Sequence, residues 1–367
     1  MIDPPRLDRR TLNRALLARQ LLLARQSMPV GAAVAHLVGL QAQAPAPPYF
    51  GLWSRLVDFD PVELARLLQD RQVVRAPSLR ATIHLVAAAD CLPLRGLLQP
   101  VFDRHLAADP ARAPAIAGLD RAALAAAGRE LLAGQAYSSR ALGPLLARHW
   151  PERDPAVLVW AVQLLLPLLQ PPPRGVWGAS GQATWTTAES WLGRPAGGAL
   201  DPAELVRRYL AGFGPAMVAD IQQWSGLTGL AEVVQRMELR RFRDEPGRVL
   251  YDLPEAPIPE PDAPAPARFV APFDNLVIGH ADRTRVISDP HRRQVFTVNG
   301  IVKGTVLVDG FVAGSWRLDQ TRSGATLAVE PFGRLPEPDR SELAAEGSRL
   351  LEFAAPAATH HEVRFVR

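Results

Sequence analysis

The chain of 367 residues has few of the residues on which several kinds of chemistry depend. A single cysteine, Cys91, excludes an internal disulfide and a zinc site made of several thiolates. Lys303 is the single lysine and falls on an expected hairpin strand, which argues against an enzyme that works through a lysine Schiff base. No apolar run reaches about 18 residues without a polar interruption, and the N-terminus has no signal-peptide pattern. We therefore expect a cytoplasmic protein that does not bind membranes.

Several common catalytic motifs are also absent. The sequence contains no P-loop, no Rossmann fingerprint, no His-Glu-x-x-His and no Gly-x-Ser-x-Gly. Its eight histidines are scattered, apart from His360-His361-Glu362 in an expected terminal strand. We therefore expect neither a metal ion nor a cofactor.

Arginine dominates the positive charge. The chain carries 41 basic and 37 acidic residues, a net charge of +4, and all but one of the basic residues are arginine. A GC-rich coding bias explains this, and it also suits the abundance of alanine, leucine and proline. Contact with phosphate groups explains it equally well, because the arginine fork suits phosphate. The charge alone does not establish a nucleic-acid partner.

The length predicts about two to four domains, and the first has a recognisable order of elements. Helices are expected over Thr11–Gln26 and Val30–Gln43, and a third begins at Asp60 with a proline and a capping-box glutamate, Glu63. Strands are expected at 72–75 and 79–86. Three helices followed by a hairpin are the order of a winged helix.

The same order recurs twice further along the chain. The second set of helices is expected at Arg121–Ala133, Ser138–His149 and Asp154–Leu169, with a hairpin at 174–178 and 182–187. The third set is expected at Ala203–Ala211, Met217–Ser225 and Leu227–Leu239, with a hairpin at 240–243 and 248–253. The sequence therefore predicts tandem winged-helix units.

The C-terminal part has a different pattern. Residues 253–266 hold six prolines and are expected to form a semi-rigid linker. Strands are then expected at 268–276, 284–288, 294–298, 301–308, 311–318, 326–331 and 361–366, with a helix at 339–353. We predict an α+β fold: winged-helix units at 1–118, 119–200 and 201–253, the linker at 254–267, and a β-barrel or curled sheet at 268–367.

Two glutamines stand out at the end of the second expected helix. Gln41 and Gln43 precede a proline-stiffened loop, and Ala44, before Pro45, is biased out of the helical region. Residues two apart diverge on a helix but share a face on extended backbone. The two carboxamides are therefore expected to converge at this helix end. The alternative is that both are helix residues facing solvent, since a Gln-x-Gln tripeptide alone is a weak signal.

Other polar groups follow on strands and loops. Arg80, Thr82 and His84 alternate with apolar residues and share one face of a strand, which is either functional or merely solvated. Arg174, Trp177 and Trp185 form a basic and aromatic patch, or else the tryptophans close a core. The basic hairpin at 240–243 and the loop at 289–293 are expected to reach phosphates, the loop as a protruding hairpin tip.

These landmarks resemble those of the AlkZ-like DNA glycosylases over nearly the whole chain. The resemblance rests on Gln41-x-Gln43, Arg80-x-Thr82-x-His84, the run Pro-Arg-Gly-Val-Trp-Gly at 173–178, and the motifs at 273–275 and 279–283. It implies a catalytic role for Gln41 and Gln43 with His84 nearby, and winged-helix units with a C-terminal β-barrel around a DNA channel. It also implies repair of alkylated DNA or resistance to a genotoxic natural product.

The expected partner is double-stranded DNA carrying alkylated purines, bound by a monomer. The residues expected to contact DNA are Arg80, Thr82, Arg174, Trp177, Arg240, Arg241, Asn275, His280, Arg283, Arg292 and Arg293.

A glutamine pair suits this chemistry only for activated bases. Most glycosidic cleavage needs an acid to protonate the leaving group, but an N7-alkylated purine is already cationic. The enzyme then has to aim a water and stabilise positive charge on the sugar, and a carboxamide oxygen can accept a hydrogen bond from that water. Bulky lesions, including crosslinks, would suit an open cleft better than a tight base-flipping pocket. The alternatives are a non-enzymatic regulator with winged helices and a scaffold that no longer binds DNA.

Overall fold

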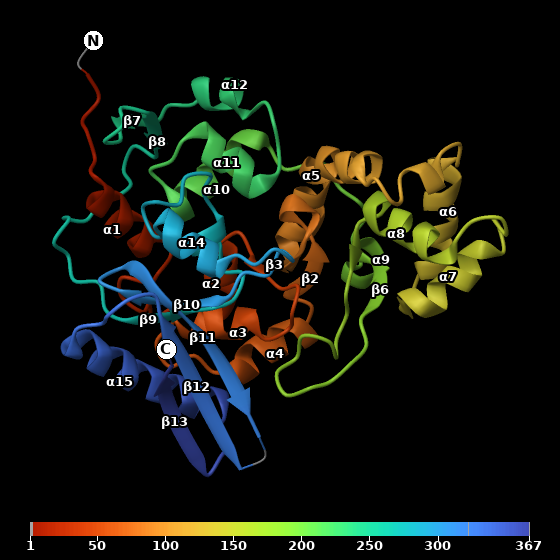
Figure 1. Ribbon diagram of the computed structural model, residues 1–367. Helices are drawn as coiled ribbons and strands as arrows, with labels where there is room; N and C mark the ends of the chain where they lie inside the picture. Colours follow the sequence, from red (N-terminus) through yellow and green to blue (C-terminus); the bar gives the residue numbers. More distant parts are fainter. Residues whose placement is uncertain (1–2, 322, 367) are drawn as a thin grey trace.

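A computed structural model describes residues 3–321 and 323–366. The fold is α+β, with mostly helical elements in the first two thirds of the chain and a five-stranded sheet near the C-terminus (Figure 1).

The N-terminal elements surround a small sheet. They are α1 (Arg9–Arg19), α2 (Val30–His36), β1 (Leu40–Gln41), α3 (Pro47–Trp53), α4 (Pro61–Gln69), β2 (Val73–Pro77) and β3 (Ile83–Ala87). The strand order is β1-β3-β2, all antiparallel. The predicted cap of α4 is confirmed, since the Asp60 side chain accepts from the Val62 N–H. Glu63, however, accepts from the Val30 N–H and so joins α4 to α2.

The long helix α5 (Ala88–Ala108) follows, and the sequence reading missed it. It contains Pro93 and Pro100, which are usually helix breakers. It also lacks a one-sided apolar pattern, because it packs against β2 and β3 on one side and against α8 and α9 on another. A helix covered on several sides has no strong periodic signal.

The N-terminal element order then recurs twice. The second group comprises α6 (Arg121–Leu132), β4 (Tyr137–Ser138), α7 (Ser139–Ala147), α8 (Pro155–Leu165), β5 (Leu168–Leu169), β6 (Thr184–Thr187) and α9 (Ala188–Leu192). The third comprises α10 (Pro202–Phe213), α11 (Val218–Ser225), α12 (Leu230–Gln235), β7 (Arg240–Arg243) and β8 (Val249–Asp252). The second sheet has the order β4-β6-β5, and Ala216 pairs with Tyr251 of β8 in the third.

Counted from α2 in the first group, each group is thus a helix, a short extended segment, two helices and a hairpin, and the short segment pairs with the second hairpin strand. One predicted hairpin strand, at 174–178, is wrong. The first strand of that pair is β5, six residues earlier, and the proline-rich stretch after it forms a long loop, since proline lacks the N–H that a ladder requires.

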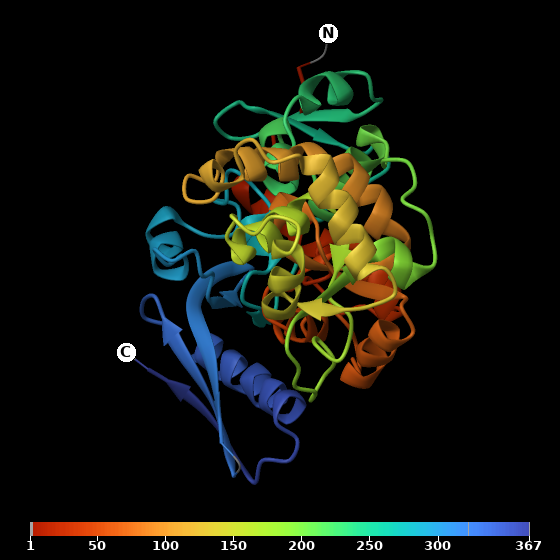
Figure 2. The same ribbon diagram turned by 90° about the vertical axis from the view of Figure 1, so that its right-hand side faces the viewer.

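The C-terminal sheet is open. Its strands are β9 (Arg268–Val270), β10 (Gly304–Val308), β11 (Phe311–Gln320), β12 (Gly324–Pro331) and β13 (His360–Phe365), in the order β13-β12-β11-β10-β9. Helix α15 (Glu337–Ala354) lies along one face (Figure 2). Among the described residues the sheet does not close into a barrel, so the predicted barrel is wrong and an open five-stranded sheet stands in its place.

Two other C-terminal predictions are also wrong. The segments 284–288 and 294–298 are not strands, and α14 (Asp289–Val295) begins between them with Ser288 as its cap. Asp274 likewise caps the short helix α13 (Asn275–Ile278). In both places a cap followed by local helical hydrogen bonds outweighs a short period-two pattern.

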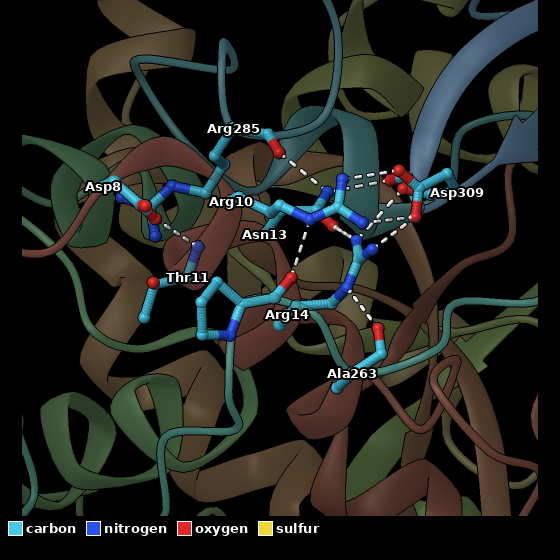
Figure 3. A network of polar contacts seen from close by, with 10 residues as sticks. Asp8, Arg10, Thr11, Asn13, Arg14, Ala263, Arg285 and Asp309 are labelled. Carbon is cyan, nitrogen blue, oxygen red and sulfur yellow. Dashed lines mark hydrogen bonds and ion pairs between the residues drawn. The ribbon is translucent and has the colours of Figure 1, made fainter.

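Ion pairs and hydrogen bonds join the first helix, α1, to the C-terminal sheet. Arg10 and Arg14 both point at Asp309, in the turn between β10 and β11 (Figure 3). The side chain of Asn13 donates to the carbonyls of Arg285 and Gly310, each at 2.8 Å. The side chain of Arg14 is fully buried. Charged hydrogen bonds, as well as apolar packing, therefore hold α1 against the turn between β10 and β11.

A second ion pair is buried on both sides. Arg55, just after α3, makes two 2.8 Å hydrogen bonds to Asp274, and the exposed side-chain fractions are 0% and 1%. The pair therefore joins the end of α3, the helix that follows Gln41 and Gln43, to the C-terminal part of the chain. Removing one partner of such a pair leaves an uncompensated charge in the interior.

Replacing Asp274 by asparagine is therefore expected to destabilise the protein by about 3–5 kcal/mol. The measurement is thermal unfolding followed by circular dichroism. Glu232→Gln is the matched control, because Glu232 pairs with Arg236 and both side chains are about 80% exposed. Equal melting temperatures for Asp274→Asn and Glu232→Gln would contradict the expectation.

Candidate active site

A left-handed turn places Gln41 on a short strand, two residues before Gln43. Helix α2 ends at His36, and Val38 and Gly39 have φ of 55° and 104°. A Cβ on Gly39 would lie 2.8 Å from Val86 Cγ1, so only glycine fits there. The chain then enters β1, where Gln41 is directly opposite His84. The helix that was predicted to run to Gln43 ends at His36, seven residues earlier, because the left-handed turn interrupts it.

Both carboxamide oxygens are held by donors. Arg80 Nη2 lies 3.1 Å from Gln41 Oε1, and the Ile83 N–H lies 3.3 Å from Gln43 Oε1. A guanidinium and a backbone N–H can only donate, so the atom facing each must be oxygen. Within the described residues neither NH₂ group donates to another protein group. Each glutamine therefore has a free donor and one oxygen lone pair still available.

Arg80 links Gln41 to the third group of helices. Its guanidinium also donates to the Trp224 carbonyl in α11. Its backbone lies in the tight turn 79–81, where Arg80 and Ala81 both have positive φ, an uncommon conformation that the surrounding packing has to maintain. Burial, followed by the nearby Arg283, lowers the pKa of Arg80 to about 10, so the group stays charged near neutral pH.

His84 is buried and neutral. Its Nδ1 lies 2.9 Å from the Thr82 carbonyl, which requires the proton on Nδ1 and leaves a lone pair on Nε2. Nε2 is buried without a partner in the described residues. Burial, and then the charge of Arg80, lower the pKa of His84 to about 3. His84 is therefore not an acid near neutral pH, and it supports the wall of the site beside Gln41.

Two hollows with lining residues in common lie at Gln43 and at Arg80. The first, of about 530 Å³, has Gln43, Thr82 and Ile83 on one side and Trp160 and Trp185 on the other. The second, of about 710 Å³, is lined by residues that include Arg80, Arg104, Gln222 and Thr228. His105 and Ala108 of α5 border both hollows. Figure 1 shows α5 passing between the N-terminal elements and the α6–α9 group.

Several contributors to these hollows were missed from the sequence. Arg104 and His105 lie on the helix that was not predicted, and Trp160 faces the first hollow from α8. Arg112 also lines it, with its guanidinium 5.5 Å from the Trp160 ring centre. The alternating charges of 103–112 were the available signal, but only the fold brings them to Gln43.

Some residues expected to contact DNA are buried. Asn275 is 2% exposed and donates to the Gly39 carbonyl at 3.0 Å, so it holds the turn before Gln41. His280 is 1% exposed beside the Phe213 carbonyl, and burial lowers its pKa to about 3. Trp177 packs on Tyr49 and Phe353, with ring centres 4.8 and 5.4 Å away. These three side chains are better placed to support the site than to contact DNA.

The expected arginines are more accessible, though not equally. Arg174 is half-buried and donates to the Gly181 carbonyl, and Arg283 is half-buried over the Phe296 ring. Arg240 and Arg241 are exposed on β7, and Arg292 and Arg293 are exposed on α14. The loop predicted as a hairpin tip is thus the helix α14, which still presents its two arginines.

Residues 3–321 and 323–366 contain neither a metal-binding cluster nor a membrane-spanning helix. No group of three or more histidine, cysteine or acidic side chains is arranged to hold a metal ion. None of the described helices is long and apolar enough to cross a membrane.

The chain is similar to known proteins in both fold and sequence. The mixed helical and sheet arrangement resembles the solved DNA glycosylase AlkZ of Streptomyces sahachiroi, with a TM-score of 0.76 and 20% identity, over 98% of this chain and 100% of that one. A curated protein of the same organism, named interstrand DNA cross-link repair glycosylase, is 25% identical over 342 residues. The match spans 86% of this chain and 88% of the relative.

The protein therefore falls in the class of DNA glycosylases, which are enzymes that act on DNA. Residues 34–353 match the family described as DNA glycosylase AlkZ-like, and the chain belongs to that family.

Loss of Arg80 is expected to impair catalysis more than DNA binding. Arg80→Met releases the Gln41 carboxamide, and misplacement of a positioning group by about 1 Å costs up to about 100-fold in rate. We expect single-turnover base release to fall about 10- to 100-fold while the Kd for DNA changes little. Arg80→Lys should restore part of the rate, and Arg236→Met, at an exposed ion pair, is the control. Parallel losses of affinity and rate would contradict a positioning role.

The two buried histidines are expected to make the protein acid-sensitive. His84 and His280 have pKa values of about 3 in the fold, against 6.5 in the unfolded chain. The unfolded chain therefore takes up protons that the folded one does not. Stability is complete above about pH 6.5 and is lost as the pH falls toward 3, by about 1.4 kcal/mol per pH unit for each histidine.

The measurement is the melting temperature between pH 7 and pH 5. His280→Asn should lose less on acidification than the unsubstituted protein, whereas the exposed His149→Gln should behave like it. The same acid sensitivity in His280→Asn would mean that His280 is protonated in the folded protein.

Proposed function

We propose that this glycosylase hydrolyses the N-glycosidic bond of N7-alkylated purines in double-stranded DNA, with a water positioned by Gln41 and Gln43. The observation that supports this most directly is the fixed orientation of both carboxamides, with Gln43 in the wall of the first hollow. Held oxygens with one lone pair free, beside unpaired NH₂ groups, offer a water both an acceptor and a donor.

The reaction needs no strong base. An N7-alkylated purine carries a positive charge, so it departs without being protonated, and the barrier lies mainly in the developing charge on the sugar. A water that donates to one glutamine oxygen and accepts from the other NH₂ group has a lone pair left for the sugar carbon. The new C–O bond replaces the C–N bond, and the water's second proton passes to solvent. The oxygens also place partial negative charge near the developing cation.

The DNA would lie across the three repeated groups. Each has the helix and hairpin order of a winged helix, and we propose that residues 1–118, 119–200 and 201–253 are such units, joined through residues 254–267 to the C-terminal domain at 268–367. Arg240, Arg241, Arg292 and Arg293 are exposed and would contact phosphates. Arg104 and Arg112 border the hollows beside the glutamines.

Crosslinked DNA is a natural extension of this substrate class. The curated relative is named for interstrand cross-link repair, and the hollows lined by Gln43 and by Arg80 have volumes of about 530 and 710 Å³, more than one base needs. A wide site accommodates a lesion attached to both strands better than a tight pocket for one flipped base. We propose that this protein also releases N7-linked interstrand crosslinks.

The deciding experiment is release of base from a duplex carrying one N7-methylguanine. The unsubstituted protein should release it, and Gln41→Ala/Gln43→Ala should lose at least about 100-fold in rate. Gln182→Ala/Gln235→Ala is the matched control, because both of those glutamines are exposed and lie outside the two hollows.

Two results would overturn the proposal. The first is tight duplex binding by the unsubstituted protein without release of N7-methylguanine or of a bulkier N7 adduct. The second is full activity in Gln41→Ala/Gln43→Ala, since the water would then be positioned by other groups.

A further inference from the structure

The hollow beside Gln43 has two tryptophans on its far wall. Trp160 comes from α8 and Trp185 from β6, both in the second repeated group. Leu164, Pro77 and Ile83 add apolar surface between them and the glutamine. A wall with two aromatic rings next to a catalytic side chain offers a stacking surface within reach of the reacting base.

The two rings are held by separate contacts. Trp185 is 8% exposed and its Nε1 donates to Ser139 Oγ at 3.2 Å, so its ring is fixed in the wall. Gln163 Nε2 lies 3.2 Å from the same oxygen. Trp160 is half-buried, with Arg112 over its ring at 5.5 Å. Trp160 is therefore the ring with surface left to offer a ligand.

We propose that this hollow binds the planar aromatic arm of a bulky N7 adduct, and that Trp160 is the residue that selects for it. The inference rests on the proposed function, because it places the arm next to the water-positioning glutamines. Hollows of roughly 300–1,000 Å³ hold drug-sized ligands, so 530 Å³ is more than a lone purine needs. An arm on N7 lies close to the bond being cut. It can therefore occupy a hollow that Gln43 lines while the glutamines remain near that bond.

Two DNA duplexes test the proposal, one with N7-methylguanine and one with N7-(naphthylmethyl)guanine at the same position. The quantity measured is the ratio of single-turnover release rates, aromatic over methyl. Trp160→Leu should lower this ratio about tenfold, the size expected for one lost stacking contact. Trp191→Leu is the matched control, because Trp191 is also half-buried under an arginine, Arg71 at 4.2 Å, but lies outside the hollow.

Binding is measured separately in the Gln41→Ala/Gln43→Ala background, so the proposal is tested even if chemistry is absent. There, the preference in Kd for the naphthylmethyl duplex should disappear with Trp160→Leu and remain with Trp191→Leu. An unchanged ratio and preference in Trp160→Leu would overturn the proposal. Equal losses on both duplexes would also overturn it, since the hollow would then hold the purine itself. Absence of methylguanine release by the unsubstituted protein counts against the proposed function alone.

Discussion

The left-handed turn at Val38 and Gly39 is the constraint on which the site depends. It ends α2 early and turns the chain into β1, where Gln41 pairs with His84 on β3. Gln41 then accepts a hydrogen bond from Arg80, and Gln43, two residues further on, accepts one from the Ile83 N–H at the start of β3. The turn is tight enough that no Cβ fits at Gly39, and the Asn275 side chain holds its carbonyl. The tight turn and the hydrogen bond from Asn275 therefore both fix the backbone just before Gln41.

The polar groups behind the glutamines work because water is kept from them. His84 is buried and stays neutral, and Arg80 is half-buried and held as a cation by its two oxygen partners. In such surroundings a hydrogen bond orients its partner more firmly than at the surface. The carboxamides gain orientation rather than basicity from this arrangement, which suits a reaction whose leaving group is already charged.

The site is assembled from all parts of the chain. The glutamines and Arg80 come from the first group of elements, the tryptophan wall from the second, and the carbonyl that anchors Arg80 from the third. Helix α5 lies between the two hollows, and the C-terminal domain holds the turn and the following helix through Asn275 and Asp274. A fold of repeated small units can hold such a site only if the contacts between units are well packed.

Much of the architecture could be predicted from the sequence. Caps such as Asp60-Pro61 and Asp201-Pro202 mark helix starts through local hydrogen bonds, and both helices begin there. The hairpin of β7 and β8 follows from its turn and apolar pattern. Helix α5 and the open C-terminal sheet did not follow, because burial on several sides removes periodicity and strand closure depends on distant pairing.

The sequence by itself therefore picked out Gln41, Gln43 and His84 as candidates for the site, since they stand in one recognisable pattern, and it determined the repeated order of elements. The tertiary structure alone decided which groups hold the two carboxamides, Arg80 for Gln41 and the Ile83 N–H for Gln43, and which tryptophans line the hollow beside Gln43. Those facts depend on contacts between residues 39 to 144 positions apart, and no local pattern in the sequence encodes the distance between such residues.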